Sequence, residues 1–355
     1  MLNYKDIFLK NSFSMSKTIK KKWYFINQKK LCNFHYKYSK DYKKITNNFF
    51  GGIKKKNNIE ELPYLHSSIF KNQRLISKID SNSEKIFRSS GTTGKKYSQI
   101  SIDKKTSFLQ ARTLNKIFND FFNEKFDHIF FIDNNKIQFG SESFTARGSA
   151  IKGFSQLAKN KTFLLNENFE INLKSLKNYI KRNPNKKFII FGFTSFIHEF
   201  FIKKLKTKKI KLNLKNSILI HGGGWKKMED KRISRYEFNK MIRKVSGISK
   251  VYNYYGMVEQ TGSVFFECEK GFFHSSIFSE VLIRDKNLKS NVYINKGLVQ
   301  VMSLLPLSYP GHNILTEDLG KIYGEDTCKC GRKGTYFKIL GRVPNTELRG
   351  CSDTY

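Results

Sequence analysis

The chain has 355 residues, and its 39% hydrophobic and 15% aromatic content is ample for one large buried core or two smaller ones. Its 66 Lys and Arg residues against 29 Asp and Glu give a formal net charge of +37, which is typical of proteins that meet nucleic acid or an anionic membrane surface. The lysines are nevertheless dispersed among abundant Asn, Ile and Phe, as A/T-rich codon usage would produce. We therefore favour compositional drift over a dedicated nucleic-acid surface and read the chain as globular.

The cysteines and the apolar segments argue against secretion and membrane insertion. Five cysteines in a chain of this length do not resemble a disulfide framework, so we expect a reducing, cytoplasmic setting. Charges interrupt every apolar run of the N-terminal "MLNYKDIFLKNSFSMSKTIKKKWYF", which therefore lacks a signal-peptide core. The most apolar segment, "FIIFGFTSFIHEFFI", contains His198 and Glu199 and is shorter than the roughly 20 residues of a spanning helix. We expect no membrane span.

The chain divides into three parts by its hydrophobic pattern. Residues 1–60 are basic and aromatic with loose helical spacing, and they end near the loop "GGIKKKNN". Residues 61–260 alternate apolar runs with amphipathic stretches, which predicts a helical and largely parallel α/β core with right-handed crossovers and sites at the carboxyl ends of the strands. Residues 261–355 carry strand patterns with short connections, which predicts a mainly antiparallel β subdomain.

Individual elements follow from the same patterns. The predicted strands of the core are "DHIFFID", "KKFIIFGF", "NSILIHGGG" and "KVYNYYG". "TSFIHEFFIKKLK" is predicted to be a helix, and so is "SRYEFNKMIRKVSG", in which Ser234 and Glu237 form a capping box and Gly247 ends the helix. The strands predicted further along the chain are "VFFEC", "SEVLIRD", "GLVQVMSLL" and "YFKILGR".

The stretch "SSGTTGKK" has the composition of a phosphate-binding loop. Gly91 and Gly94 permit a tight turn whose backbone N–H groups converge on an anion, and neighbouring hydroxyls and Lys95 add donors and charge. It is not a Walker loop, because position 89 is Ser and position 96 is Lys. A plain Ser/Thr/Gly hairpin between "KIF" and "YSQISI" is the alternative.

Three later segments favour a nucleotide site. "YYGMVEQTG" places Glu259 just after a strand end, where a carboxylate suits a magnesium ion bridging phosphates. "LTEDLG" places Asp318 on a predicted tight turn, where one carboxylate can accept both hydroxyls of a ribose. "LGRVPNTELRG" offers Arg342 and Arg349, whose forked donors suit phosphate or ribose oxygens.

Together and in this order, these segments resemble the adenylate-forming superfamily of acyl and aryl acid ligases. More closely, the chain resembles the LuxE family, the acyl-protein synthetases of the bacterial bioluminescence fatty-acid reductase complex. The similarity runs from about residue 60 to the end and rests on "FRSSGTTG", "ARGSAIKGF", "HGGGWKKMED", "YYGMVEQTG", "SYPGHNILTEDLG", "CKCGRKG" and "GRVPNTELRGCSDTY". It implies the α/β fold of the N-terminal domain of adenylate-forming enzymes, with a largely parallel sheet, helices and the antiparallel subdomain.

The resemblance implies an acid:thiol ligase that uses ATP and Mg²⁺. A fatty or other acyl carboxylate attacks the α-phosphate to give an acyl-adenylate and pyrophosphate, and a protein thiol then takes the acyl group as a thioester. Glu259 would bind Mg²⁺, Asp318 the ribose, and Arg342 the ribose or a phosphate. The remaining ATP-binding residues implied are Ser89, Ser90, Gly91, Thr92, Thr93, Gly94 and Lys95 for the phosphates, and Gly222, Gly223, Gly224, Tyr254, Tyr255 and Gly256 for the adenine.

Two features of the tail bear on the chemistry. Most members of the superfamily continue into a small C-terminal lid domain with a catalytic lysine, whereas this sequence stops at Tyr355. Either Lys95 or Lys226 compensates, or a partner protein completes the site. Cys351 in "RGCSDTY" matches the cysteine that this family acylates, and the nearby Arg349 would lower the pKa of its thiol. The alternative is that Cys351 is only a small residue in the tail of the chain, without a role as acyl acceptor.

The other cysteines allow a zinc site. Cys268 and His274 lie in "CEKGFFH", and Cys328 and Cys330 in "CKC". If the two loops meet, they form a Cys₃His tetrahedral set, as related aryl-acid ligases do, although the C-x-C spacing is unusual. The alternative is that these four side chains are reduced and structural and bind no metal. Cys32 is interpreted as a packing residue.

Among the histidines, we interpret His198 as a core residue on a helix. His221 precedes the glycine cluster and is a candidate for lining the acyl or nucleotide pocket. His312 is expected to brace the turn that leads to Asp318.

The expected function is therefore ATP-dependent activation of an acyl carboxylate and its transfer to a protein cysteine. A ligase of the same fold that loads coenzyme A or an acyl carrier protein in a polysaccharide or lipid pathway is the nearest alternative. A basic nucleic-acid-binding protein is a distant one, because it leaves the glycine loop and "LTEDLG" unexplained. The expected partners are the acyl substrate and an acyl-accepting protein, either a reductase subunit or an acyl carrier protein, with no specific nucleic acid.

Overall fold

The structure, a computed structural model, describes residues 2–79, 81–88, 97–139, 145–225, 232–290 and 295–344. These residues form two compact units. The first unit contains residues 2–88, 97–122 and 256–344, and the second contains residues 123–255, apart from the gaps just given. The second unit is therefore inserted in sequence between two parts of the first.

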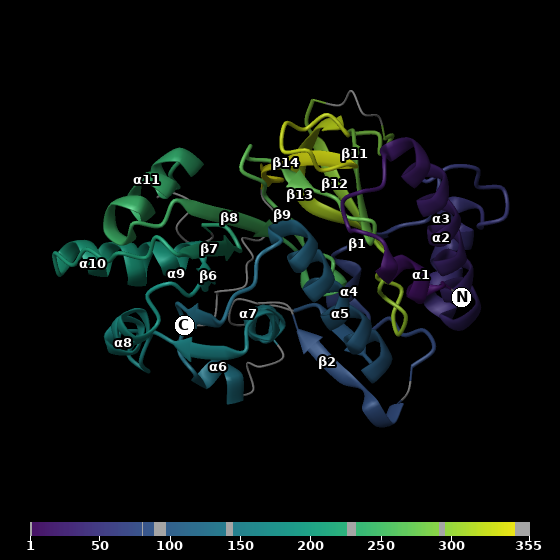
Figure 1. The fold of residues 1–355 in the computed structure, drawn as a ribbon. Coiled ribbons are helices and arrows are strands. Elements are labelled where there is room, and N and C mark those ends of the chain that lie inside the picture. The colour runs from purple at the N-terminus through teal and green to yellow at the C-terminus, as the bar shows by residue number, and fades with distance from the viewer. Residues whose placement is uncertain are drawn as a thin grey trace. The chain divides into compact units, whose positions relative to one another are not determined.

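Parallel strands form the sheet of the second unit, where they lie in the order β5, β4, β6, β7, β8. Figure 1 labels the neighbouring strands β6, β7 and β8. The bounds are His128–Phe131 for β4, Asn160–Phe163 for β5, Phe188–Phe193 for β6, Ser217–Gly222 for β7 and Lys250–Tyr255 for β8. Every residue of β6 and β7 is buried, as expected for parallel strands covered on both faces. The α/β core with a parallel sheet is thus confirmed.

Helices connect these strands. They are α6 (Lys136–Phe139), α7 (Ala146–Phe154), α8 (Lys174–Arg182), α9 (Thr194–Phe196), α10 (Lys204–Thr207) and α11 (Arg235–Ser246). The capping box predicted for α11 is present, because Ser234 Oγ accepts from the Glu237 amide and the Glu237 carboxylate accepts from the Ser234 amide. Gly247 follows in the left-handed conformation, with φ of 75°. The helix predicted after β6 forms with a π-helical turn, Ile197–Lys203, between α9 and α10.

An antiparallel sheet forms the first unit, in the strand order β10, β14, β13, β12, β11, with β1 added parallel to β13. The bounds are Leu65–His66 for β1, Phe273–His274 for β10, Ser279–Arg284 for β11, Gly297–Ser303 for β12, Asn313–Glu325 for β13 and Thr335–Arg342 for β14. β9 (Phe265–Phe266) precedes them. This confirms the antiparallel β subdomain near the C-terminal end of the sequence.

The rest of the first unit is mainly helical. It contains α1 (Tyr4–Leu9), α2 (Lys17–Tyr38), α3 (Lys40–Phe50), α4 (Ile69–Asn72) and α5 (Lys104–Phe122). β2 (Lys85–Arg88) and β3 (Gln99–Ile102) pair as an antiparallel ribbon. A 3₁₀ turn, Val258–Gln260, follows the second unit in sequence.

The long helix α2 packs through a polar stripe rather than an apolar one. Its buried residues recur every three or four positions and include Lys20, Tyr24, Gln28 and His35. The Lys20 ammonium lies 3.2 Å from the Glu280 carboxylate of β11, and the Gln28 amide donates to the Ser303 carbonyl of β12 at 3.1 Å. Buried polar side chains need such partners, so these contacts fix the helix against the sheet.

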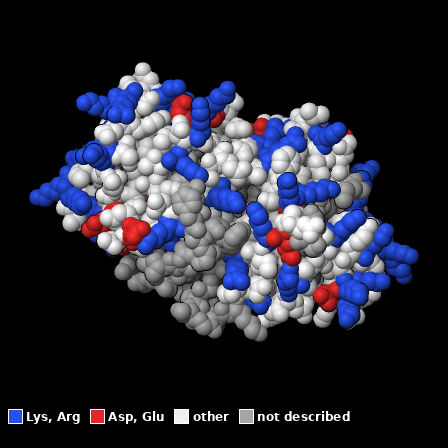
Figure 2. All heavy atoms as spheres, turned by 90° about the horizontal axis from the view of Figure 1, so that it is seen from below, with Lys and Arg blue, Asp and Glu red and all other residues white. Residues whose placement is uncertain are grey.

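Among the described residues, none of the helices combines the length and the apolar character that crossing a membrane requires. Lys and Arg side chains are spread over the face seen in Figure 2, with uncharged surface between them, rather than gathered into one stripe. A dispersed pattern of this kind fits a solvated surface.

Candidate active site

Two antiparallel strands bring Asp318 and Arg342 together. The register of β13 and β14 places these residues directly opposite each other. Arg342 Nη2 donates to Glu317 Oε2 at 2.7 Å, and Arg342 Nε lies 3.4 Å from Asp318 Oδ1. One guanidinium is therefore shared between two neighbouring carboxylates, a task for which its planar fork of donors is suited.

The expectation that Asp318 lies on a tight turn is wrong. Asp318 lies inside β13, which pairs with β12 on one side and β14 on the other. Gly320, which suggested a turn, instead permits close approach of the strands, because a Cβ there would lie 2.6 Å from Val299 Cγ2 and 2.9 Å from the Lys338 carbonyl oxygen. Arg342 supplies the positive charge that accommodates two adjacent acids within the strand.

Glu259 lies on the 3₁₀ turn after β8 and is only 5% exposed. Burial raises the pKa of its carboxyl group, the Ser98 hydroxyl opposes this by hydrogen bonding, and the charges of Glu317 and Asp318 raise the pKa further. The first unit thus holds three mutually repelling carboxylates, a charge distribution that a divalent cation would relieve. The position of Glu259 just after a strand end is as predicted.

The carboxyl ends of β6 and β7 form a second polar cluster, in the second unit. Thr194 Oγ1 donates to the Gly222 carbonyl at 3.0 Å and lies 2.9 Å from His221 Nδ1. Because the single hydroxyl proton goes to the carbonyl, His221 Nδ1 carries a proton and donates to Thr194. Burial lowers the pKa of His221 to about 3, so the ring is neutral.

Gly222 lies against the ring of Tyr254, which comes from the neighbouring strand β8. A Cβ at position 222 would lie 2.4 Å from Tyr254 Cε1, closer than any real contact. Phe154 also packs on this ring, with 4.9 Å between ring centroids. Gly223 and Gly224 both have positive φ values, 77° and 67°, which glycine adopts at little cost. The glycines are therefore required by the local backbone and by Tyr254.

The predicted nucleotide residues are divided between the two units. Glu259, Asp318 and Arg342 belong to the first unit, where Asp318 and Arg342 lie opposite each other, and Gly222–Gly224 and Tyr254–Tyr255 belong to the second. Gly256 directly follows β8. The phosphate-loop residues 89–95, and also Lys226, Arg349 and Cys351, lie outside the described residues. The segments flanking the loop pair as β2 and β3, with Arg88 opposite Gln99.

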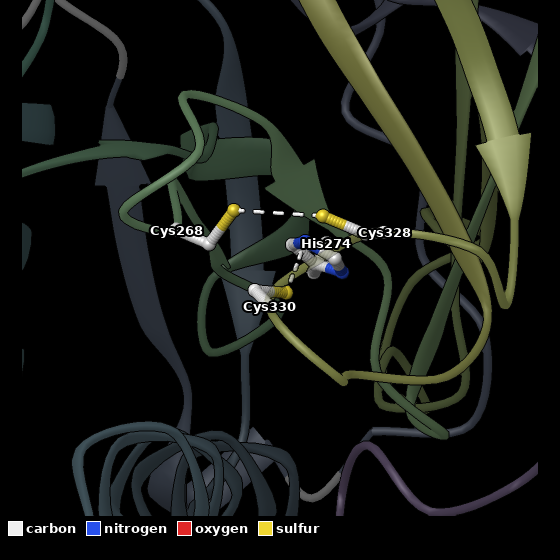
Figure 3. Close-up of side chains that lie close together, drawn as sticks. All are labelled: Cys268, His274, Cys328 and Cys330. Atoms are coloured by element: carbon white, nitrogen blue, oxygen red, sulfur yellow. Dashed lines mark hydrogen bonds between the residues drawn. The ribbon is translucent and has the colours of Figure 1, made fainter.

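The four predicted zinc ligands lie together in the first unit (Figure 3). Their ligand atoms are all within 4.8 Å of one another. Cys268 Sγ is 3.9 Å from Cys328 Sγ, and Cys330 Sγ is 3.3 Å from His274 Nε2. Tetrahedral zinc with Zn–S bonds of about 2.3 Å separates two sulfurs by about 3.8 Å. The two loops therefore meet with spacings that fit this ion.

Two similar turns present the sulfurs. The Gly271 amide donates to the Cys268 carbonyl at 2.8 Å, and the Gly331 amide donates to the Cys328 carbonyl at 3.0 Å. Each turn thus runs from a cysteine to a glycine three residues later, and both glycines have positive φ. Hydrogen bonds from Cys268 and His274 lower the pKa of the Cys330 thiol, so one sulfur of the group is readily a thiolate, the form that binds metals.

His35, His198, His312 and Cys32 are buried. His198 lies on the π-helical turn, with its ring 5.1 Å from that of Trp225. His312 Nε2 lies 3.3 Å from Cys32 Sγ and 3.3 Å from the Tyr42 hydroxyl oxygen. Burial raises the pKa of Cys32 to about 12, which leaves this thiol unreactive.

Sequence reasoning missed Glu317 as a member of the acidic group. The available signal was the pair of adjacent acids in "LTEDLG", which is unusual inside an apolar strand. It also missed the contact that Tyr309 makes with Glu259, because the two residues are 50 positions apart.

Comparisons with known proteins agree with this picture. The family model for "Acyl-protein synthetase, LuxE" matches residues 4–355. The chain is 26% identical over 333 residues to the long-chain-fatty-acid–luciferin-component ligase of Vibrio harveyi, which covers 90% of this chain and 83% of the relative.

Similar solved structures are those of 2-hydroxyisobutyryl-CoA ligase. Its open conformation, in complex with an acyl-AMP and CoA, gives a TM-score of 0.73 at 15% identity and covers 94% of this chain and 77% of that chain. The thioesterification state gives 0.72 at 16% identity, covering 94% and 70%. At this identity the likeness concerns the fold, which is that of adenylate-forming ligases. Because the family model extends over nearly the whole sequence, the chain belongs to the LuxE family of acyl-protein synthetases.

Proposed function

We propose that this enzyme activates a fatty acyl carboxylate with ATP and transfers the acyl group to a cysteine of a protein. Family membership and the fatty-acid substrate named for the Vibrio harveyi relative support this reaction. The observation that carries the proposal is the acidic group of the first unit, in which Arg342 bridges Glu317 and Asp318, and the charges of these two carboxylates raise the pKa of buried Glu259.

The reaction has two steps. A carboxylate oxygen of the acid attacks the α-phosphorus of ATP, the bond to the β-phosphate bridging oxygen breaks, and acyl-AMP and pyrophosphate form. A thiolate sulfur then attacks the acyl carbonyl, AMP leaves, and a thioester remains. Phosphoryl-group chemistry of this kind depends on positioning and preorganised charge rather than on covalent help from the protein.

Glu259 would hold Mg²⁺, which when bound supplies positive charge to the phosphates. Its burial and its acidic neighbours fit this role, because a cation would favour the ionised carboxylate that burial disfavours. Asp318 would accept hydrogen bonds from the ribose hydroxyls, and Arg342 would donate to ribose or phosphate oxygens. Gly222–Gly224 and Tyr254–Gly256 would line the adenine.

The loop residues Ser89–Lys95 would hold the phosphates, and the Cys351 thiol would accept the acyl group before it passes to the partner protein. These assignments rest on the sequence resemblance, and they predict separable defects. Lys95→Ala should impair acyl-adenylate formation. Cys351→Ser should leave acyl-adenylate formation intact and abolish acylation of the enzyme, because the acceptor thiol is lost.

Acid-dependent exchange of labelled pyrophosphate into ATP tests the first step. Glu259→Gln should lower this exchange by at least about 10²-fold, since it removes the charge that holds the cation. Glu61→Gln is the matched control, because it neutralises an exposed carboxylate of the first unit. Exchange in Glu259→Gln equal to that of the control would refute the assignment.

Long-chain acids and short acids should be compared in the same assay, and labelled acyl groups should be followed to protein and to coenzyme A. Label in acid-stable, thiol-sensitive linkage to protein supports the proposed acceptor. Label found only on coenzyme A would instead indicate a CoA ligase of the same fold.

We also propose that Cys268, His274, Cys328 and Cys330 hold a structural zinc ion. The group joins the turn before β10, and β10 itself, to the turn between β13 and β14. The spacing of the sulfurs and the mixed Cys₃His donor set support zinc rather than magnesium.

A further inference from the structure

Tyr309 is a fully buried residue that contacts the backbone of Glu259, the candidate cation ligand. Its hydroxyl donates to the Glu259 backbone carbonyl at 2.7 Å. This carbonyl belongs to the short 3₁₀ turn Val258–Gln260, a single turn in which the Gln260 amide donates to the Met257 carbonyl at 3.1 Å. The direction of the Glu259 side chain follows the backbone of this turn, so the tyrosine hydroxyl helps to set it.

Gln260, the last residue of this turn, is held by its side chain as well. The Gln260 side-chain amide donates to the Gly311 carbonyl at 2.8 Å and to the Val301 carbonyl at 3.1 Å. Gly311 lies so close that a Cβ there would be 2.8 Å from the Glu259 carbonyl oxygen and 2.2 Å from Tyr309 Cε2. The segment 309–311 thus lies directly against the Glu259 carbonyl and the Gln260 side chain.

The Tyr309 segment is itself rigidly attached to the first unit. The Ser308 hydroxyl donates to the Ser101 carbonyl at 2.9 Å, and the Ser77 amide donates to the Ser308 carbonyl at 2.8 Å. The edge of the Tyr309 ring packs on Phe70, with 6.2 Å between ring centroids. A hydroxyl on so fixed a support can orient a neighbouring peptide, as second-shell groups orient metal ligands.

We propose that Tyr309, together with Gln260, is a positioning residue that aims the Glu259 carboxylate at the divalent cation required for adenylate formation. The proposal rests on the proposed function, in which Glu259 binds that cation. Tyr309 touches neither substrate nor metal in this scheme. Its removal leaves the charge of Glu259 in place but frees the turn to rotate, so the defect should appear mainly as weaker use of the cation.

The experiment is a Mg²⁺ titration of acid-dependent pyrophosphate exchange with the full chain. Tyr309→Phe should raise the Mg²⁺ concentration for half-maximal exchange by about 10- to 100-fold, the usual effect of losing a partner of a metal ligand. Exchange at saturating Mg²⁺ should recover to within a few-fold of the parent. Gln260→Met, which keeps the side-chain length and removes the other anchor, should shift the titration in the same direction.

Tyr4→Phe is a matched control. The Tyr4 hydroxyl also donates to a backbone carbonyl of the first unit, that of Leu304, at 2.6 Å, so both variants lose the same kind of hydrogen bond. Thermal unfolding should therefore change similarly in Tyr309→Phe and Tyr4→Phe, whereas only the former should change the Mg²⁺ requirement.

The outcomes separate this inference from the function on which it rests. If Glu259→Gln loses the Mg²⁺ dependence but Tyr309→Phe and Gln260→Met titrate like the parent, the positioning role is refuted. If Glu259→Gln itself titrates like the parent, Glu259 is not the cation ligand, and both the assignment and the inference fail. Should Tyr309→Phe fail to fold, the Gln260→Met titration decides.

Discussion

Acid should destabilise the first unit through the buried pair His35 and His312. The two rings stack with 4.6 Å between centroids and neither is exposed. His35 Nε2 lies 3.2 Å from the Pro306 carbonyl oxygen, so it carries the proton, and Nδ1 accepts from the Ser77 hydroxyl at 2.7 Å. A second proton would place a charge in the core and turn Nδ1 from an acceptor into a donor toward the Ser77 hydroxyl.

The expected magnitude follows from linkage. Burial lowers the pKa of His35 from 6.5 to about 3, and burial and His35 lower that of His312 well below 6.5. The folded state therefore binds fewer protons than the unfolded state below pH 6.5, and stability falls as pH falls from there toward pH 3. For His35 alone, going from pH 7 to pH 5 costs about 2 kcal/mol. Glu280 does not interfere in this range, because burial is outweighed by Lys17 and Lys20, which hold its pKa at about 2.

Urea unfolding at pH 7 and pH 5 measures this cost. The chain has two tryptophans, Trp23 on α2 and Trp225 in the second unit, so the Trp225→Phe background lets fluorescence report on the first unit. In that background His35→Gln should lose about 2 kcal/mol less than its parent between the two pH values. His66→Gln changes an exposed histidine whose pKa burial also lowers, but less than that of His35, so this variant should recover less of the loss than His35→Gln. An equal loss in the His35 variant would refute the linkage argument.

Three further predictions concern other parts of the molecule. The purified protein should contain about one zinc per chain by elemental analysis, and Cys328→Ser should lose it while Cys32→Ala keeps it; full zinc in Cys328→Ser would exclude the site. Gly222→Ala should displace the Tyr254 ring, because the new Cβ would lie 2.4 Å from it, and raise the KM for ATP about tenfold with little change in the KM for the acid. Ser234→Ala should cost the second unit about 1 kcal/mol in urea, followed by tryptophan fluorescence, through loss of the helix cap; an unchanged midpoint would contradict that role.

Elements with strong local signals could be predicted from the sequence. The strands β6 and β7 are continuous apolar runs, and α11 carries both of its boundary signals, at Ser234 and at Gly247. These patterns depend on residues that are close in sequence, so the sequence alone is enough. The glycine cluster 222–224 was recognised in the same way.

Other features depend on contacts between distant residues. Helix α2 gave only loose helical spacing because its buried stripe contains Lys20, Gln28 and His35, whose partners lie about 260 to 280 positions away. β13 contains Glu317 and Asp318, which look like turn residues until Arg342 is known to lie opposite. The polar residues of α2 can be buried, and the acids of β13 can lie in a strand, only because each has a partner far away in the sequence. Local patterns do not reveal such partners.

The first unit is assembled from the two ends of the described chain, and this has a consequence during synthesis on the ribosome. Helix α2 emerges early, yet the acid that pairs with Lys20 lies 260 residues later, at Glu280. Until that strand has been translated, the helix presents a stripe suited to burial but without its counterpart, while residues 123–255 of the inserted unit have already been made. Residues 123–255 should therefore be able to fold while the N-terminal helix still lacks the strand on which it packs.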